Sequence, residues 1–354
     1  MKILVWLSGG VDSAVTALLL KQQWHEVIGG FMINYSEPEN PRCTTRQDLR
    51  EAKKVAEFLE IPLLTFNFQK EYKQHIIDYI IDGYKQWITP NPDVFCNNLI
   101  KFDLFLEEAL ELGCNKMATG HYAKIEYEKG RTNGASLLRW IDTTKDQSYF
   151  LSGLNQHQLS KALFPLGDLT KKEIRTIASE AGLPNADRPD SQGLCFIGNV
   201  SIKDFLQNYL PTKRGDILDT KGNKVGEHDG AYAFTIGQKK GLWLNFKAYV
   251  VSTDITKNTI TITDNKEDPA LYSTWVEIKN RHRIQHPTSN FSPLTISYKI
   301  RYRQDPQPGK LSLTKENEVQ IIFDSPVRAV PPGQIAVAYD DDVVIGSGII
   351  SQIM

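Results

Sequence analysis

The sequence predicts an α/β protein in which a parallel-sheet domain precedes a small β-rich unit and a C-terminal β-barrel. Two observations support this prediction. Along residues 1–205, buried-strand patterns alternate with helical patterns, which is typical of a parallel sheet with helices on both faces. Beyond that point, short alternating apolar runs are separated by glycine-rich turns, as in antiparallel sheets. We therefore expect domains at 1–205, 206–271 and 272–354.

The first domain is expected to begin with a buried strand that runs into a glycine turn and a helix. Apolar runs mark its strands, and apolar residues that recur every three or four positions mark its helices. The expected strands are 2–7, 27–33, 61–68 and 116–125. The expected helices are 11–19, 49–59, 76–87, 99–112 and 171–181.

The rest of the chain is expected to be almost entirely strand. "YVVSTDITKNTITIT" (249–263) has the alternation of a hairpin. Five further runs of the same kind indicate a small barrel: 294–304, 310–314, 318–323, 334–339 and 343–350.

The composition is that of an ordinary globular protein. The chain has 354 residues, 41% of them hydrophobic, and a formal net charge of −1, so nucleic-acid binding would need local basic patches. No apolar run is long enough to cross a membrane, and the apolar start lacks the features of a signal peptide, so we expect a cytoplasmic protein with no membrane partner. Four dispersed cysteines without a CxxC pair argue against a structural zinc site or a disulfide framework.

The stretch "WLSGGVDS" (6–13) is the first candidate for ligand binding. Gly9 and Gly10 let the backbone approach an anion, towards which the amides of the helix start would point. Ser8 and Ser13 add hydroxyl donors, whereas Asp12 would either cap the helix or help to hold a magnesium ion. No lysine follows the glycines, so this is not a Walker loop. Such a loop suits pyrophosphate as a leaving group; the alternative is a plain strand–helix turn.

Cys96 is the first of two cysteines in unusual surroundings. Pro90 and Pro92 predict an extended segment before it, and a helix is expected to begin near Asn97. A thiol close to a helix N-terminus has a lowered pKa and is a better nucleophile. Asp93, three residues earlier, is a candidate general acid or base.

Cys195 is the second cysteine in unusual surroundings. It lies between two glycines in "DSQGLCFIGN", which suits a thiol that must be reached and must move. Cys114 is expected to be a small core residue, and the role of Cys43 is left open. Together with an ATP-activating loop, Cys96 and Cys195 suggest that ATP activates an oxygen and sulfur displaces it. One cysteine would carry a persulfide, and the other would release its sulfur by thiol exchange.

Longer motifs occur in order along the whole chain: "LSGGVDS", "NPDVFCN", "IKF", "ATGHYA", "KDQSYFL", "LFPLGDL", "DSQGLCFIG", "GEHDGAYAFTIGQKKGL", "IRYRQ" and "VPPGQ". With these motifs the chain resembles the tRNA-specific 2-thiouridylase family, whose catalytic domain belongs to the PP-loop ATP pyrophosphatases (adenine nucleotide alpha hydrolase-like). The resemblance implies that ATP, with Mg²⁺, adenylates the C2 oxygen of the wobble uridine (position 34) of tRNA. Persulfide sulfur would then replace AMP to give 2-thiouridine, with pyrophosphate as the other product.

The resemblance also implies the roles of individual residues. Cys96 would be the nucleophile and Cys195 the persulfide carrier, with Asp93 as a third catalytic residue, and a Cys96–Cys195 disulfide could end the cycle. ATP would contact Trp6, Leu7, Ser8, Gly9, Gly10, Val11, Asp12, Ser13, Met32 and Gly120. The tRNA would contact Asn91, Pro92, Asp93, His121, Lys145, Asp146, Gln147, Arg301, Tyr302 and Gln334. The implied partners are tRNAs of the Lys, Glu and Gln type and a protein that donates persulfide sulfur.

Part of the implied tRNA surface also follows from residue chemistry. "KIRYRQ" (299–304) alternates basic and aromatic residues, which suits phosphate contacts and base stacking, and Lys239 and Lys240 add a basic patch. Two departures from the family pattern stand out: Trp6 replaces a small residue, and "NYSEPENPRCTT" (34–45) replaces a more acidic stretch.

Two other classes of function are compatible with part of the pattern. The first is another PP-loop ligase, such as a lysidine or argininosuccinate synthetase, which needs no paired cysteines. The second is a non-catalytic RNA-binding protein with a relict nucleotide loop, against which the intact Ser8, Asp12 and Ser13 argue. A cluster-dependent tRNA thiolase would need CxxC motifs, which the sequence lacks.

Overall fold

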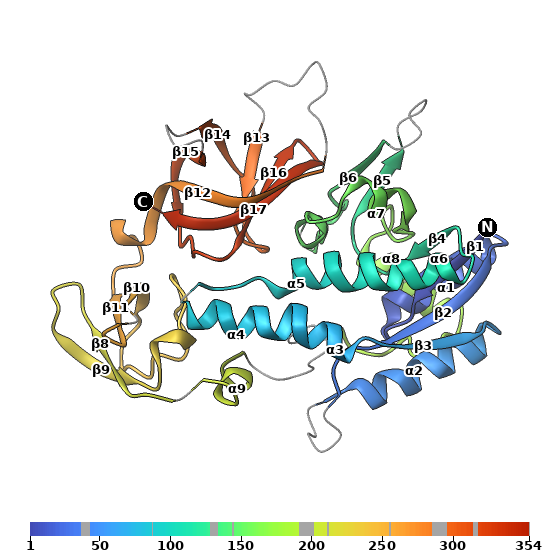
Figure 1. Ribbon diagram of the computed structural model, residues 1–354, viewed down its shortest axis with the longest axis horizontal. Coiled ribbons are helices and arrows are strands. Elements are labelled where there is room, and N and C mark those ends of the chain that lie inside the picture. The colour runs from blue at the N-terminus through green and yellow to red at the C-terminus, as the bar shows by residue number, and fades with distance from the viewer. Residues whose placement is uncertain are drawn as a thin grey trace.

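The computed structural model describes most of the chain (Figure 1). The described residues are 1–36, 43–86, 88–127, 134–143, 145–190, 202–210, 212–254, 256–284, 296–313 and 318–353. Cys195 therefore lies outside the described residues, as does the rest of "DSQGLCFIGN" after its first residue, Asp190.

The N-terminal domain is built on a five-stranded parallel sheet with the order β3-β2-β1-β4-β7. Its strands are β1 (Lys2–Trp6), β2 (Glu26–Ile33), β3 (Leu63–Asn67), β4 (Lys116–Ala118) and β7 (Ala162–Leu163). Successive side chains of β1 enter opposite faces, so that Ile3 and Val5 join one apolar cluster and Leu4 joins another. The strand order reverses beside β1, and ligands of such sheets bind at the carboxyl ends of the strands at that point.

Helices cover both faces of this sheet, as predicted. One face packs against α1 (Val11–Gln22), α2 (Thr45–Phe58) and α8 (Lys171–Glu180). The other face packs against two longer helical runs, which lie side by side in Figure 1. The first run joins α3 (Gln69–Tyr72), the π-helix η1 (Lys73–Ile77) and α4 (Asp78–Lys85). The second joins α5 (Pro92–Phe95), the π-helix η2 (Cys96–Leu104) and α6 (Phe105–Glu111).

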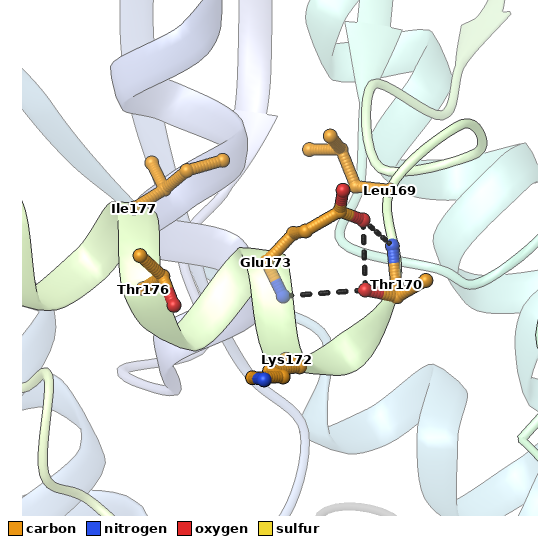
Figure 2. A pocket seen from close by; sticks show the side chains of 6 residues that line it. All are labelled: Leu169, Thr170, Lys172, Glu173, Thr176 and Ile177. Carbon is orange, nitrogen blue, oxygen red and sulfur yellow. Dashed lines mark hydrogen bonds between the residues drawn. The ribbon is translucent and has the colours of Figure 1, made fainter.

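The start of α8 is fixed by a capping box (Figure 2). The Thr170 hydroxyl accepts from the Glu173 amide at 3.3 Å, and the Glu173 carboxylate accepts from the Thr170 amide at 2.6 Å. These hydrogen bonds to Thr170 lower the pKa of Glu173. The hollow drawn in Figure 2 is lined by one side of α8 and contains none of the predicted site residues. The cap matters to the site because it fixes the position of Lys171, the first residue of the helix.

The second unit is a four-stranded sheet with the order β10-β11-β8-β9. Its strands are β8 (Gly215–Leu218), β9 (Lys224–His228), β10 (Tyr249–Asp254) and β11 (Thr259–Thr263). The antiparallel pairing of β10 with β11 confirms the predicted hairpin.

The third unit is a closed six-stranded barrel, which confirms the predicted fold class. Its strands are β12 (Tyr272–Arg283), β13 (Ile296–Lys299), β14 (Gln307–Leu313), β15 (Val319–Arg328), β16 (Ile335–Asp340) and β17 (Val343–Ile353). β12 pairs with both β15 and β17, so the sheet closes on itself. The remaining described elements are short: η3 (Ser148–Leu151), α7 (Gln156–Lys161), α9 (Ile202–Gln207), η4 (Ala231–Ala233) and η5 (Pro269–Leu271).

The predicted strand 116–125 is wrong as a single element. It divides into β4 and β5 (Lys124–Tyr127), because the chain between them turns at Gly120 against the start of α1. β5 pairs with β6 (Ala135–Leu138), and β6 meets the barrel strand β17 at the pair Val343–Leu138. A sheet therefore runs from the barrel into the first domain, which local periodicity does not reveal.

Within the described part of the chain, none of the helices combines the length and apolarity that a membrane span requires.

A buried carboxylate joins the first domain to the barrel. Asp146 is 1% exposed and accepts hydrogen bonds from the Trp140 amide at 3.1 Å and from the Ser148 amide and hydroxyl, both at 3.0 Å. The Lys299 ammonium of β13 lies 3.7 Å from Asp146, and the Arg139 Nε lies 3.6 Å away. Burial lowers the pKa of Lys299, and the charge of Asp146 opposes that shift.

We predict that Asp146→Asn destabilises the protein by about 3–5 kcal/mol, because it leaves buried cations without their counter-charge. The free energy of unfolding in urea would measure this. Asp168→Asn is the control, since Asp168 is an exposed partner of Lys124 and such pairs contribute about 0–1 kcal/mol. Equal stability of the two variants would contradict the prediction.

Candidate active site

The glycine loop between β1 and α1 lies at the carboxyl edge of the sheet. Gly9 has a φ of +82°, and a Cβ there would lie 2.5 Å from the Asp48 carbonyl oxygen, so only glycine fits. Gly10 is the N-cap of α1 and makes no side-chain cap, so the first-turn amides remain available to a ligand. The Ser13 hydroxyl donates to the Gly10 carbonyl at 2.9 Å and accepts from the Ser8 amide at 3.2 Å, which holds the loop in shape.

A lysine from a distant part of the chain completes this loop. The Lys171 ammonium lies 2.7 Å from the Asp12 carboxylate, 159 residues away in sequence. It also donates to the Tyr122 hydroxyl at 2.6 Å. The predicted capping role of Asp12 is wrong, because Gly10 occupies the cap and Asp12 pairs with Lys171 instead. The loop contains no lysine in its own sequence, but the folded structure places Lys171 beside it.

Further cations converge on Asp190, beside Lys171. Its carboxylate lies 2.9 Å from Lys171, 3.1 Å from Lys145 and 2.6 Å from Arg175. Burial by itself would raise the pKa of Asp190, but hydrogen bonds and charge from these cations hold the pKa well below its usual range. Asp190 therefore remains ionised and orders three cations beside the loop.

Two side chains from the segment after α8 hold the Gly9 carbonyl of the loop. Arg188 donates to the Gly9 carbonyl at 2.9 Å and pairs with Asp48, and the Asn185 amide donates to the same carbonyl at 2.9 Å. Sequence reasoning missed Lys171, Arg188 and Asn185, because "TKKEIR" and "NADRPD" resemble ordinary helix and turn segments. Their function depends on the packing of α8 against α1.

The chain after β4 forms the second wall of the site. A Cβ on Gly120 would lie 2.9 Å from the Asp12 carbonyl carbon, so the two backbones are in direct contact. His121 is buried, and its Nδ1 lies 2.7 Å from the Thr119 hydroxyl. Burial and the nearby charge of Lys101 hold the pKa of His121 well below its usual value, so the ring is neutral at physiological pH. In this conformation the His121 ring carries no positive charge that could pair with a tRNA phosphate.

Lys101 connects the nucleotide loop with the Cys96 segment. It lies in "IKF" on η2, is only 5% exposed, and places its ammonium 4.3 Å from the ring centroid of Trp6. The ring of Trp6 therefore makes a cation–π contact with Lys101, so the side chain as well as the backbone of this residue has a role in the structure. Burial raises the pKa of Asp93, and the charge of Lys101 partly opposes that shift. Sequence reasoning assigned no role to this lysine, and the only available signal was its place in an apolar helix segment.

The helix that carries Cys96 begins earlier than predicted. Asn91 is its N-cap and accepts from the Val94 amide at 3.4 Å, and Pro92 is the first helical residue. The predicted start near Asn97 is therefore wrong; an Asn–Pro pair marks a helix start as well as an extended segment. Cys96 lies beyond the first turn and is 1% exposed. Because the field of a helix terminus decays within its first turn, that argument for a reactive thiol does not hold here.

Asp93, in the first turn of α5, is half-buried and close to the junction of the domains. Burial raises the pKa of its carboxyl, and the ammonium of Lys101 only partly opposes the shift. A carboxyl with a raised pKa beside a cation is suited to proton transfer near neutral pH.

The barrel contacts the segment that precedes this helix. Gln334 donates to the Thr89 carbonyl at 2.9 Å, and its oxygen accepts from the Asn91 side chain at 3.3 Å. Gly333 has a φ of +91°, and a Cβ there would lie 2.8 Å from the Thr89 amide nitrogen. Gln334, predicted to touch tRNA, therefore positions Asn91 in this structure.

Four other predicted tRNA residues also lie at the domain junction. Arg301 donates to the Ile236 carbonyl of the second unit at 2.7 Å. The Tyr302 ring packs on Phe150 with centroids 4.3 Å apart, and its hydroxyl donates to the Lys145 carbonyl at 3.4 Å. The Gln147 side chain accepts from the Tyr122 amide at 3.0 Å. Asp146 is enclosed, so its carboxylate is not accessible to tRNA in this conformation.

The other predicted residues complete the description. Met32 is buried and lies near the carboxyl end of β2. Cys114 is buried, as expected for a core thiol. Among the described residues, no group of three or more His, Cys, Asp or Glu side chains is arranged to hold a metal ion.

A glycine loop at the switch point of a parallel sheet, with free helix-start amides and surrounding cations, defines a nucleotide-binding α/β domain of the PP-loop kind. Family profiles match residues 1–199 (tRNA methyl transferase HUP domain), 203–264 (tRNA methyl transferase PRC-barrel domain) and 274–350 (aminomethyltransferase beta-barrel domain).

Full-length relatives identify the family. The chain is 43% identical to tRNA-specific 2-thiouridylase MnmA of Alkaliphilus oremlandii, over 100% of this chain and 98% of the relative. It is 44% identical to tRNA-specific 2-thiouridylase MnmA 1 of Geobacillus kaustophilus, over 100% and 96%. It is 41% identical to the MnmA of Bacillus subtilis, over 99% and 95%. The chain therefore belongs to the tRNA-specific 2-thiouridylase MnmA family.

We predict that Lys171→Ala lowers tRNA-dependent pyrophosphate release roughly a hundredfold, as expected for losing a preorganised donor and leaving Asp12 unpaired beside the phosphates. Steady-state release of pyrophosphate would measure this. Lys172→Ala is the matched control, because Lys172 is the exposed next residue of α8. A Lys171→Ala enzyme as active as the control would exclude this role.

We predict that Asp93→Asn stabilises the protein at neutral pH while lowering activity. A carboxyl whose folded-state pKa is raised contributes stability that is complete below its unfolded pKa and is lost as pH rises through the folded pKa. Above the unfolded-state pKa the desolvated carboxyl thus costs folding free energy, and asparagine removes that cost. Thermal melts at acidic and neutral pH would measure the effect, with the exposed Asp103→Asn as control. Equal melting shifts for both variants would argue against the prediction.

Proposed function

We propose that the protein is an ATP-dependent tRNA-uridine 2-sulfurtransferase, which converts the wobble uridine (position 34) of tRNA to 2-thiouridine with release of AMP and pyrophosphate. The observation that carries the proposal is the position of Lys101. Its ammonium contacts Trp6 of the nucleotide loop and acts on Asp93 of the Cys96 helix, so adenylation and sulfur transfer can share one site. The full-length family match supports the same reaction.

In the first step, the loop amides and Lys171 would bind the β- and γ-phosphates of ATP. The uracil C2 oxygen attacks the α-phosphorus, the bond to the bridging oxygen breaks, and pyrophosphate leaves. Mg²⁺ would neutralise phosphate charge, and Asp12 is the carboxylate placed to help hold it. This fits the absence of a three-ligand cluster among the described residues, since Mg²⁺ on nucleotides is commonly bound by one or two carboxylates plus phosphates.

The uridine must leave the base stack to reach this site. The segment from Asn91 to Asp93 would form its pocket, because Asn91 is fixed by Gln334 and Asp93 is half-buried beside Lys101. In its protonated form Asp93 can donate to the uracil, and in its ionised form it can accept a proton.

In the second step, the terminal sulfur of a Cys195 persulfide would attack C2, and AMP would leave with the C2 oxygen. The Cys96 thiolate would then attack the inner sulfur, leaving a C2 thiocarbonyl and a Cys96–Cys195 disulfide that a reductant must reopen. Alternatively, Cys96 would first free hydrosulfide, which attacks C2. Cys96 is 1% exposed, so either route requires its helix turn to open. The proposed partners are tRNAs of the Lys, Glu and Gln type and a persulfide-bearing donor protein.

The test incubates full-length enzyme with ATP, Mg²⁺, a sulfide source and unmodified tRNA, and then analyses nucleosides by mass. We expect 2-thiouridine from wild-type protein, and we expect Cys96→Ser and Cys195→Ser to lose it when a persulfide donor replaces sulfide. Cys43→Ser is the control, because this half-buried thiol hydrogen-bonds to the nearby Thr45 and the mechanism gives it no role.

Other outcomes would identify the alternatives. Modified uridine without dependence on either cysteine would favour another PP-loop ligase. Tight tRNA binding without pyrophosphate release would indicate a non-catalytic RNA-binding protein. A methylated nucleoside, which two of the matched domain descriptions would suggest, would also overturn the proposal.

A further inference from the structure

A loop of the second unit exposes basic and aromatic side chains together. Residues 239–247, "KKGLWLNFK", connect Gln238 to the strand β10. Trp243 is 89% exposed and Phe246 is 45% exposed, although most tryptophans in folded proteins are largely buried. Exposed lysines flank them: Lys239, Lys240 and Lys247. The sequence indicated a basic patch at Lys239 and Lys240, but neither the mechanism nor the predicted site residues use the exposed aromatic side chains of this loop.

The loop is a built structure held at its base. The Gly237 amide donates to the Val250 carbonyl at 2.7 Å, and the Val250 amide donates to the Gln238 carbonyl at 3.1 Å. The Gln238 side chain donates to the Lys240 carbonyl at 2.9 Å, which fixes the turn that carries the lysines.

The fold also forces Trp243 outward. Its neighbour Leu242 is buried in the core of the second unit, and the partly buried Leu244 packs against the same core. Trp243 lies between these two anchors with a φ of +54°, a conformation that non-glycine residues rarely adopt. The exposed ring is therefore presented by a defined backbone.

The segment that leads into the loop contacts the segment before the proposed base pocket. The Thr235 hydroxyl lies 3.3 Å from the hydroxyl of Thr89, two residues before Asn91. Arg301 of the barrel donates to the carbonyl of Ile236 at 2.7 Å. A tRNA whose wobble base reaches Asp93 would therefore pass close to this loop.

The charge of the loop favours a polyanion. Within the part of the chain that the structure describes, no ion pair joins a carboxylate to Lys239, Lys240 or Lys247. Three other exposed lysines of this unit are paired: Lys224 with Glu227, Lys257 with Asp254 and Lys266 with Glu267. Lysines beside exposed aromatic rings are the pattern of single-stranded RNA surfaces, where rings stack on bases and ammonium groups contact phosphates.

We propose that residues 239–247 bind the tRNA beside the flipped wobble base, with Trp243 stacking on an unpaired base and Lys239 and Lys240 contacting phosphates. This inference rests on the proposed function for the identity of the RNA. The anticodon loop supplies unpaired bases next to the one that is modified.

The test measures binding of full-length enzyme to an unmodified tRNA transcript by fluorescence anisotropy over a range of salt concentrations. Trp243→Ala should weaken binding about tenfold, and Trp243→Phe should restore most of the affinity, because a smaller aromatic ring still stacks. The double variant Lys239→Ala with Lys240→Ala should reduce the slope of log affinity against log salt by about two.

The chain offers a matched control for each change. Trp24 is 93% exposed with a φ of +61°, but it lies between α1 and β2, at the sheet edge opposite the nucleotide loop. Trp24→Ala should bind tRNA as the wild type does. Lys221→Ala with Lys257→Ala removes the same charge from turns elsewhere in the second unit, and it should change the salt slope less.

The outcomes separate this proposal from the proposed function. Wild-type thiolation together with unchanged tRNA binding by the Trp243 and lysine variants would overturn the RNA surface and leave the function intact. Binding that depends on Trp243, without thiolation by the wild type, would support the surface and overturn the function. Unchanged tRNA binding with slower sulfur delivery from a donor protein would assign the loop to a protein partner and overturn the proposal, as would a Trp243→Leu variant that binds as well as Trp243→Phe.

Discussion

The site depends on how the segment before α5 is held, because that segment positions Asp93 and Cys96. Gln334 of the barrel binds the carbonyl of Thr89, and Thr235 of the second unit contacts the Thr89 hydroxyl. Each of the other two units thus reaches the same few residues of the first domain. The contacts leave no room for a side chain on Gly333, so the approach is one of backbone to backbone. All three units therefore contribute to the position of the proposed base pocket.

The site has two regions that differ in their electrostatics, namely the nucleotide loop and the proposed base pocket. Around the nucleotide loop, Lys171 neutralises Asp12, and Asp190 gathers several cations, which prepares a place for phosphate charge. Around the base pocket, burial dominates: it raises the pKa of Asp93 and keeps His121 neutral. Lys101 interacts with both regions, through the ring of Trp6 and through its charge on Asp93. Under the proposed mechanism, stability and activity would oppose each other at Asp93, because the burial that raises its pKa also costs folding free energy.

Much of this protein was determined by its sequence alone. The alternation of strands and helices, the change to strands near residue 205, and the glycine loop are local patterns, and they predict the fold class, the phosphate-binding turn and the family. Buried Cys114 and the β10–β11 hairpin followed from the same local rules. Such features are readable because propensity, periodicity and turn chemistry act between residues that are close in sequence.

Tertiary structure alone decided which side chains meet. Lys171 reaches Asp12 across 159 residues, and Gln334 reaches Thr89 across 245. Asp146 is enclosed, although the family resemblance implied a contact with tRNA. It also decided that Cys96 lies inside a helix that begins at Pro92, and that the fold holds Trp243 exposed between two buried leucines. The physical reason is that charge pairing and burial depend on distance through the folded protein, and spacing along the chain does not encode that distance.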